Sequence, residues 1–206
     1  DKYLQLLKIS GGLNRIIYYR DEINSELTNA RCAEIQSQKR FHYRNLIKTG
    51  KIKVRDGVRR LIKELANHNV EQFIVTTSGR ESLEPFLNST LQSYLDFFSN
   101  MITYEDVKKH KPFPDAYNLA VQLSNKSNAN CIAIEDSNIG VKAAKSANIN
   151  CLLTLPPWSS NLKNISKNAN ACVDSLGNKQ YKSTLIYGKP LISENVDYPY
   201  LLDIIN

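Results

Sequence analysis

The chain has 206 residues, of which 42% are apolar and 23% are charged, and its formal net charge at pH 7 is +7. These proportions are close to the globular average and exclude a wholly disordered chain or a fibrous repeat. No apolar run reaches the roughly 18 residues of a membrane span, and no secretory signal opens the chain, so we expect no membrane partner and a cytoplasmic location. The positive charges are interspersed with Asp and Glu, which argues against a nucleic-acid partner.

The cysteines stand far apart in the sequence and form no Cys-x-x-Cys pair, so we expect no zinc site. They are Cys32, Cys131, Cys151 and Cys172. The last three lie in apolar runs that are typical of buried strands.

Residues 1–49 have a helical pattern. Apolar residues recur at helical spacing on both sides of Gly11-Gly12, and a long polar helix follows. Thr28 or Asn29 is its expected N-cap, and Gly50 is its expected end. No strand is predicted in this part.

After Gly50 the pattern changes to short apolar strands that alternate with helices. The predicted strands are Gln72–Thr76, Ser99–Thr103, Cys131–Ile134, Asn150–Thr154 and Ala171–Val173. The predicted helices are Val58–Leu65, Arg80–Asn88, Pro112–Leu123, Ile139–Ala147 and Ser159–Asn168. This alternation predicts an α/β fold with a parallel sheet. Ligands of such sheets bind beyond the carboxyl ends of the strands, so the polar residues there are the candidate site.

The first candidate strand end is the run Thr76-Thr77-Ser78-Gly79, which separates an apolar strand from a helix. Its hydroxyls, its backbone N–H groups and the helix N-terminus suit a phosphoryl group. The same residues also suit a simple helix cap.

The second candidate is Lys111, which stands before Pro112 and Pro114 at the start of a predicted helix. A lysine held there can direct a compact positive charge at a phosphate. The alternative is a solvated lysine beside a proline-initiated helix.

The third candidate is Glu135-Asp136-Ser137, at the end of an apolar strand. Two adjacent carboxylates repel each other and lose hydration, which is tolerated when a hard cation or a cationic side chain is near. Mg²⁺ suits such oxygen ligands. Alternatively, Asp136 or Ser137 acts only as a helix N-cap.

Taken together, the order hydroxyl, Lys-Pro and Glu-Asp-Ser-x-x-Gly resembles the haloacid dehalogenase superfamily of phosphohydrolases. The resemblance implies a Rossmann-like parallel sheet with a small helical cap domain. It also implies that Thr76 and Lys111 bind the transferring phosphoryl group, with help from Thr77 and Ser78. Glu135 and Asp136 would hold Mg²⁺ against the same group.

The segment Gly11-Gly12-Leu13-Asn14-Arg15-Ile16 is similar to the cap of the CbbY-type enzymes, the xylulose-1,5-bisphosphate phosphatases. By this resemblance Arg15 and Lys39 would grip the distal phosphate of the substrate, although Arg40 and Arg44 could replace Lys39. We therefore expect a cap at 1–49, a core at 50–206 and a monomer. Residues 178–206 read as an irregular tail that packs on the core through Tyr198, Leu201, Leu202 and Ile205.

The Asp-x-Asp motif that carries the nucleophile of this superfamily is absent from the chain. The resemblance implies that the motif lies upstream of Asp1, on a strand between those that end at Thr76 and Glu135. We therefore expect that about 40 residues precede this chain in the working enzyme, a length judged from family layout and domain size, and that the chain alone is inactive.

Two other functions remain compatible with the residues. A β-phosphoglucomutase would pass the phosphoryl group between sugar positions and release no free phosphate. A non-catalytic protein would use the same cradle to bind a sugar phosphate, as the missing nucleophile suggests.

Overall fold

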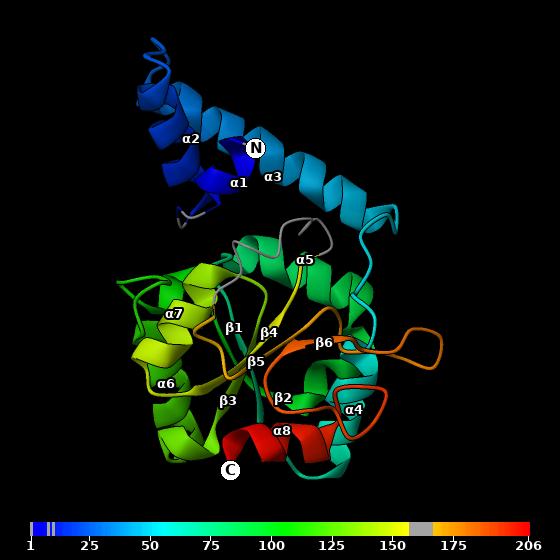
Figure 1. Cartoon of the computed structure of the whole chain (residues 1–206). Helices are drawn as coiled ribbons and strands as arrows, with labels where there is room; N and C mark the ends of the chain where they lie inside the picture. Colours follow the sequence, from blue (N-terminus) through cyan, green and yellow to red (C-terminus); the bar gives the residue numbers. More distant parts are fainter. Residues whose placement is uncertain (1, 8, 10, 157–166) are drawn as a thin grey trace.

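The computed structural model describes residues 2–7, 9, 11–156 and 167–206 (Figure 1). The chain begins with the helices α1 (Lys2–Leu6), α2 (Gly12–Glu22) and α3 (Asn29–Lys48). As predicted, the described residues of this part form no strand. Thr28 caps α3 as predicted, because its hydroxyl accepts a hydrogen bond from the Arg31 N–H at 3.2 Å. In Figure 1 this helical part, which we call the cap, lies beside α5 of the remaining domain, the core.

The core contains every strand that the sequence predicts. They are β1 (Gln72–Val75), β2 (Phe98–Ile102), β3 (Ile132–Glu135), β4 (Asn150–Thr154) and β5 (Ala171–Val173). The helices between and around them are α4 (Val58–Asn67), α5 (Arg80–Thr90), α6 (Asp115–Ser124) and α7 (Asn138–Ser146). The short 3-10 helices are η1 (Gln92–Phe97), η2 (Tyr104–Asp106) and η3 (Asn128–Asn130).

Most predicted boundaries differ from the structure by one or two residues, and two differences bear on the interpretation. The helix expected from Pro112 begins at Asp115. A proline disfavours helical dihedrals in the residue before it, and two prolines lie just ahead of this helix. Cys131 precedes β3 and is half-buried, whereas Cys151 and Cys172 are buried inside their strands as expected. The helix predicted at Ser159–Asn168 falls mostly outside the described residues.

The strands form two sheets. The pair β1–β2 is parallel, and the second sheet has the order β3-β4-β5-β6, in which only β6 (Leu185–Tyr187) runs antiparallel to its neighbour. Among the described residues, β1 pairs only with β2 and β3 only with β4. These are the two strands between which we expected an absent strand.

The tail is ordered, which corrects the expectation of an irregular segment. It supplies β6 and the helix α8 (Tyr198–Ile205), which Asp197 caps by accepting the Tyr200 N–H at 2.9 Å. Tyr200, Leu201 and Ile204 are buried, whereas Leu202 is 37% exposed. The helical spacing of these residues was masked by two prolines and by a polar stretch before α8.

The hydrophobic core lies on both faces of the second sheet. On one face, Leu153 and Cys172 pack against Tyr117 and the small residues of α7. On the other face, Leu152 packs against α4 and α8. This packing fixes the strands whose ends form the site. Of the helices in the described part of the chain, none has the length and apolarity to cross a bilayer.

Candidate active site

A cleft of about 310 Å³ lies at the carboxyl ends of β1, β3 and β4. Its lining includes Thr76 and Thr77 after β1, Lys111 before α6, and Glu135 and Asp136 at the end of β3. The three strand ends singled out in the sequence therefore meet at one place, as parallel strands require. Ser78, Arg15 and Lys39 are not among the lining residues.

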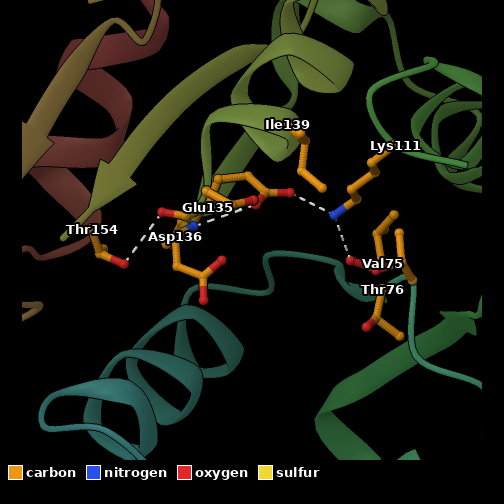
Figure 2. Close-up of a pocket in the computed structure, with 10 residues that line it drawn as sticks. Val75, Thr76, Lys111, Glu135, Asp136, Ile139 and Thr154 are labelled. Atoms are coloured by element: carbon orange, nitrogen blue, oxygen red, sulfur yellow. Dashed lines mark hydrogen bonds and ion pairs between the residues drawn. The ribbon is translucent and has the colours of Figure 1, made fainter. Parts of the chain in front are cut away.

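Lys111 is buried, with 7% of its surface exposed, and its ammonium group points across the cleft (Figure 2). Its Nζ lies 2.5 Å from Glu135 Oε1 and donates a second hydrogen bond to the Val75 carbonyl at 2.9 Å. Because Val75 ends β1 and Glu135 ends β3, this one side chain links the two sheets. The burial shows that it is not the solvated surface lysine of the alternative interpretation.

The carboxylate of Glu135 is fixed on all sides by the protein. Oε1 also accepts a hydrogen bond from the Tyr117 hydroxyl, and Oε2 accepts the Asp136 N–H at 3.3 Å. A Cβ on Gly140 would lie 1.8 Å from Oε2, so only glycine leaves room for the carboxylate there. Burial and then the Glu135 charge hold the pKa of Tyr117 well above its usual value, so this hydroxyl remains a donor.

The Asp136 side chain takes a different direction from Glu135 and is open to the cleft (Figure 2). Partial desolvation, and then the charge of Glu135, raise the pKa of Asp136. Arg55 and Lys111 act in the opposite direction. Arg55 is held by the Thr154 hydroxyl at 3.1 Å and by the Leu155 carbonyl.

The loop after β1 is braced from within and from η2. The Thr76 hydroxyl accepts the Ser78 N–H at 3.0 Å, and the Glu105 carboxylate accepts the Arg80 N–H at 3.2 Å. Glu105 therefore occupies the N-terminus of α5, which we had expected to receive a phosphoryl group. This part of the expectation is corrected, because the start of α5 is already capped by a carboxylate from the chain itself.

The two cap residues predicted to bind phosphate lie near each other. Arg15 donates hydrogen bonds to the carbonyls of Leu6 at 3.0 Å and Ile9 at 3.1 Å. Partial desolvation, and then the Arg15 charge, lower the pKa of Lys39. Arg40 and Arg44, the suggested substitutes for Lys39, instead form ion pairs with Glu81 of α5.

The carboxylates at the cleft fit a magnesium ion that takes most of its ligands from water and phosphate. Mg²⁺ is usually bound by one or two carboxylates, with water and phosphate oxygens completing the octahedron. Asp136 is the carboxylate that opens into the cleft, and Glu135 is its neighbour. Within the described ranges, no group of three His, Cys, Asp or Glu residues forms a complete metal site. The residues thus fit a metal ion that is bound jointly by the protein and a phosphate, and not one whose ligands all come from the protein.

Sequence reasoning missed four residues that shape this site. Thr154 lines the cleft and accepts a hydrogen bond from Arg55, Tyr117 orients Glu135, and Glu105 braces the loop after β1. Only Thr154 carried a usable signal, since it is a hydroxyl at the end of a predicted strand. The other three act through contacts between residues distant in the sequence.

Comparison with known proteins gives one family. Residues 6–154 match the haloacid dehalogenase-like hydrolases. CbbY of Rhodobacter capsulatus is 28% identical over 155 residues, covering 75% of this chain and 68% of that protein. A CBBY-like protein of Arabidopsis thaliana is 26% identical over 185 residues, covering 86% and 57%. The chain thus spans about three fifths to two thirds of the length of these curated relatives.

A solved structure agrees with the sequence comparison. CbbY of Rhodobacter sphaeroides, crystallised with phosphate, superimposes with a TM-score of 0.76 at 25% identity, covering 84% of this chain and 76% of that one. A mutant of that protein was crystallised with xylulose-(1,5)bisphosphate. The α/β fold with a parallel sheet, expected from the sequence, is confirmed.

Proposed function

Because this chain belongs to the haloacid dehalogenase-like hydrolases, we propose that it acts as a Mg²⁺-dependent phosphatase of sugar phosphates, with xylulose-1,5-bisphosphate as its substrate. The observation that carries the proposal is the convergence of Thr76, Lys111 and Asp136 on one cleft. Hydroxyls, a fixed ammonium group and a carboxylate together match what a transferring phosphoryl group needs.

In this proposal Lys111 and the residues after β1 bind the phosphoryl oxygens. The ammonium group of Lys111 cannot swing away, because Glu135 and the Val75 carbonyl hold it. A fixed charge needs no reorganisation when negative charge develops on the phosphoryl group. Thr76 and Thr77 supply donors on the same side, and Ser78 fixes the loop through its N–H.

Asp136 would hold the magnesium ion together with the neighbouring Glu135. When bound, the ion would neutralise charge on the phosphoryl oxygens. Partial desolvation and the nearby Glu135 charge raise the pKa of Asp136, and a bound cation would oppose both effects.

Arg15 and Lys39 would bind the second phosphate of a bisphosphate. They hold two like charges close enough that the Arg15 charge lowers the pKa of Lys39. An anion between them would relieve this repulsion. A monophosphate would leave the repulsion in place, so the pair favours a substrate with two phosphate groups.

The proposal places the nucleophilic aspartate upstream of this chain, on a strand that pairs with β1 and β3. The described edges of these two strands support it, since each has one pairing partner and Lys111 crosses from the end of one to the end of the other. Unpaired inner edges are unfavourable in a sheet, and a strand between them would satisfy both.

Titration calorimetry of the 206-residue chain tests the cleft without requiring turnover. We expect Mg²⁺ to bind more tightly in the presence of phosphate, and Asp136→Asn to abolish that binding. Asp96→Asn, an exposed carboxylate of η1, is the matched control and should leave binding unchanged. Unaltered Mg²⁺ binding in the Asp136 variant would exclude the assigned metal site.

The complete gene product tests the reaction. Release of free phosphate from xylulose-1,5-bisphosphate, lost in Asp136→Asn, would support hydrolysis. Transfer between sugar positions without free phosphate would identify a mutase. Binding without either reaction would favour a non-catalytic sugar-phosphate-binding protein.

A further inference from the structure

One carboxylate of the core joins the cap to the start of α5. Glu81 lies in the first turn of α5 and receives the guanidinium groups of both Arg40 and Arg44 from α3. The Arg40 Nη1 atom is 2.7 Å from Glu81 Oε2, and Arg44 pairs with Oε1. In the described part of the chain, these are the ion pairs that connect cap and core. We call this group the Glu81 clasp.

The clasp occupies one face of α3. Arg40, Arg44 and Ile47 follow each other at helical spacing, and Ile47 is only 1% exposed. The Ser89 hydroxyl of α5 donates to the Ile47 carbonyl at 3.4 Å and adds a polar contact to the same face. The Nε atoms of both arginines are shielded from solvent, whereas their side chains as a whole are 39% and 38% exposed.

One turn nearer its N-terminus, α3 meets α2. Gln36 lies against Gly12, where an added Cβ would be 2.5 Å from the Gln36 amide nitrogen. Lys39, three residues further along the helix, feels the charge of Arg15 in α2. One helix therefore carries the proposed phosphate-binding lysine directly beside Arg40, which attaches the helix to the core.

The core side of the clasp is directly connected to the cleft. Arg80, the neighbour of Glu81, donates its N–H to Glu105 and forms two hydrogen bonds of 2.9 Å with Asp106. The loop that precedes Arg80 carries Thr76 and Thr77 of the cleft lining. The first turn of α5 is thus held firmly to η2 and cannot shift independently of this loop.

The covalent connection is anchored to the core at Arg55 and Gly57 but is not packed around Gly50. The linker from Thr49 to Gly57 contains two glycines at positive φ, Gly50 at 68° and Gly57 at 81°. A Cβ on Gly50 would meet nothing within 4 Å, so no packing constrains the chain there. Contacts outside the linker therefore contribute to where α3 lies.

We propose that Glu81 is a positioning residue, which fastens α3 to the turn that follows the cleft loop and thereby sets the position of Lys39 relative to the cleft. What Lys39 binds rests on the proposed function, whereas the clasp itself does not. Single exposed ion pairs contribute little. Here two cations share one carboxylate on a turn that is already ordered, which reduces the entropy lost for each pair.

Pulsed electron spin resonance on the 206-residue chain measures the effect. Spin labels at Ser37→Cys on α3 and Ser93→Cys on η1 report the distance between cap and core, with half-buried Cys131 replaced by serine. We call molecules with the clasp formed, as in the structure, the closed population. We expect Glu81→Gln to lower this population by about three- to tenfold relative to the parent. About 1 M salt should act in the same direction on the parent, because it screens exposed pairs.

Matched variants separate the ion pairs from damage to the fold. Glu84→Gln removes an exposed carboxylate one turn along α5 that pairs with no cap residue in the described ranges, and it should leave the distances unchanged. Reversing the charges, with Glu81→Arg, Arg40→Glu and Arg44→Glu combined, should restore the closed population. A distance distribution in Glu81→Gln identical to that of the parent overturns the inference, and so does failure of the reversed set to restore closure in a folded protein.

A binding measurement distinguishes this inference from the proposed function. Glu81→Gln should weaken binding of xylulose-1,5-bisphosphate several-fold while leaving binding of inorganic phosphate at the cleft unchanged. If the parent binds neither compound but the distances respond as expected, the proposed function fails and the clasp stands. If the parent binds both and Glu81→Gln changes neither distance nor affinity, the clasp inference fails alone.

Discussion

Replacing Lys111 with methionine tests whether the buried pair at the cleft holds the two sheets together. The ammonium group contacts Glu135 at 2.5 Å, the Val75 carbonyl at 2.9 Å and the Tyr117 hydroxyl at 3.4 Å. Lys111→Met keeps the apolar stem and removes all three donors. The Val75 carbonyl then loses this partner, and the Glu135 carboxylate stays buried without a cation.

The expected loss follows from this burial. Both side chains are 7% exposed, so water cannot replace the lost partner without rearrangement. Breaking a buried ion pair by removing one member costs about 3–5 kcal/mol, mostly because the other charge is left uncompensated. Adding Glu135→Gln to Lys111→Met removes that charge and keeps an acceptor for Tyr117. We therefore expect the double variant to be about 2 kcal/mol more stable than Lys111→Met alone.

Urea unfolding at pH 7, followed by circular dichroism, gives the four free energies of unfolding that this cycle requires. Arg59, an exposed cation of α4 that donates to the Thr90 carbonyl, provides a control, and Arg59→Met should change stability little. A loss below about 1 kcal/mol in Lys111→Met would refute the reasoning. So would a double variant whose loss equals the sum of the two single losses, because the buried charges would then not be coupled.

Three further predictions concern neighbouring groups. Tyr117→Phe removes a donor to the buried Glu135 carboxylate and should cost about 2 kcal/mol in urea unfolding; a loss near zero would show that water replaces the hydroxyl. Gly140→Ala places a Cβ 1.8 Å from Glu135 Oε2 and should lower the free energy of unfolding by about 1–3 kcal/mol, seen as a lower Tm. An unchanged Tm would count against the close packing of this carboxylate on α7. Hydrogen bonds from Thr103, and then Arg80, lower the pKa of Asp106, so its stabilisation is present above the unfolded value of about 3.9 and is lost as pH falls through the lower folded value. Asp106→Asn should therefore cost about 1–2 kcal/mol at pH 7 and almost nothing near pH 2, and an equal loss at both pH values would disprove this role.

Several features of the fold were predictable because their signals are local. The five strands are short apolar runs followed by polar residues, and the pattern of α3 begins at a capping threonine, so both can be read within a few residues. The tail was misread because Pro190 and Pro199 suggested irregular structure. Pro199 instead lies in the first turn of α8, where a proline is tolerated.

The candidate site was predictable for a topological reason. Parallel strands place their carboxyl ends at one edge, so Thr76, Lys111 and Asp136 had to lie close together once a parallel sheet was inferred. The direction of each side chain was not predictable in this way. Glu135 and Asp136 are adjacent in sequence, yet one turns inward to Lys111 and the other opens to the cleft.

The sequence by itself determined the order of strands and helices from α4 to β4, the residue types at each strand end and the family to which they belong. Only the tertiary structure decided that Glu105 occupies the start of α5, that Tyr117 orients Glu135 and that Glu81 holds the cap. Propensity and periodicity act over a few residues, whereas these contacts join residues 18 to 41 positions apart. Their partners are chosen by the packing of the whole chain, which no local pattern records.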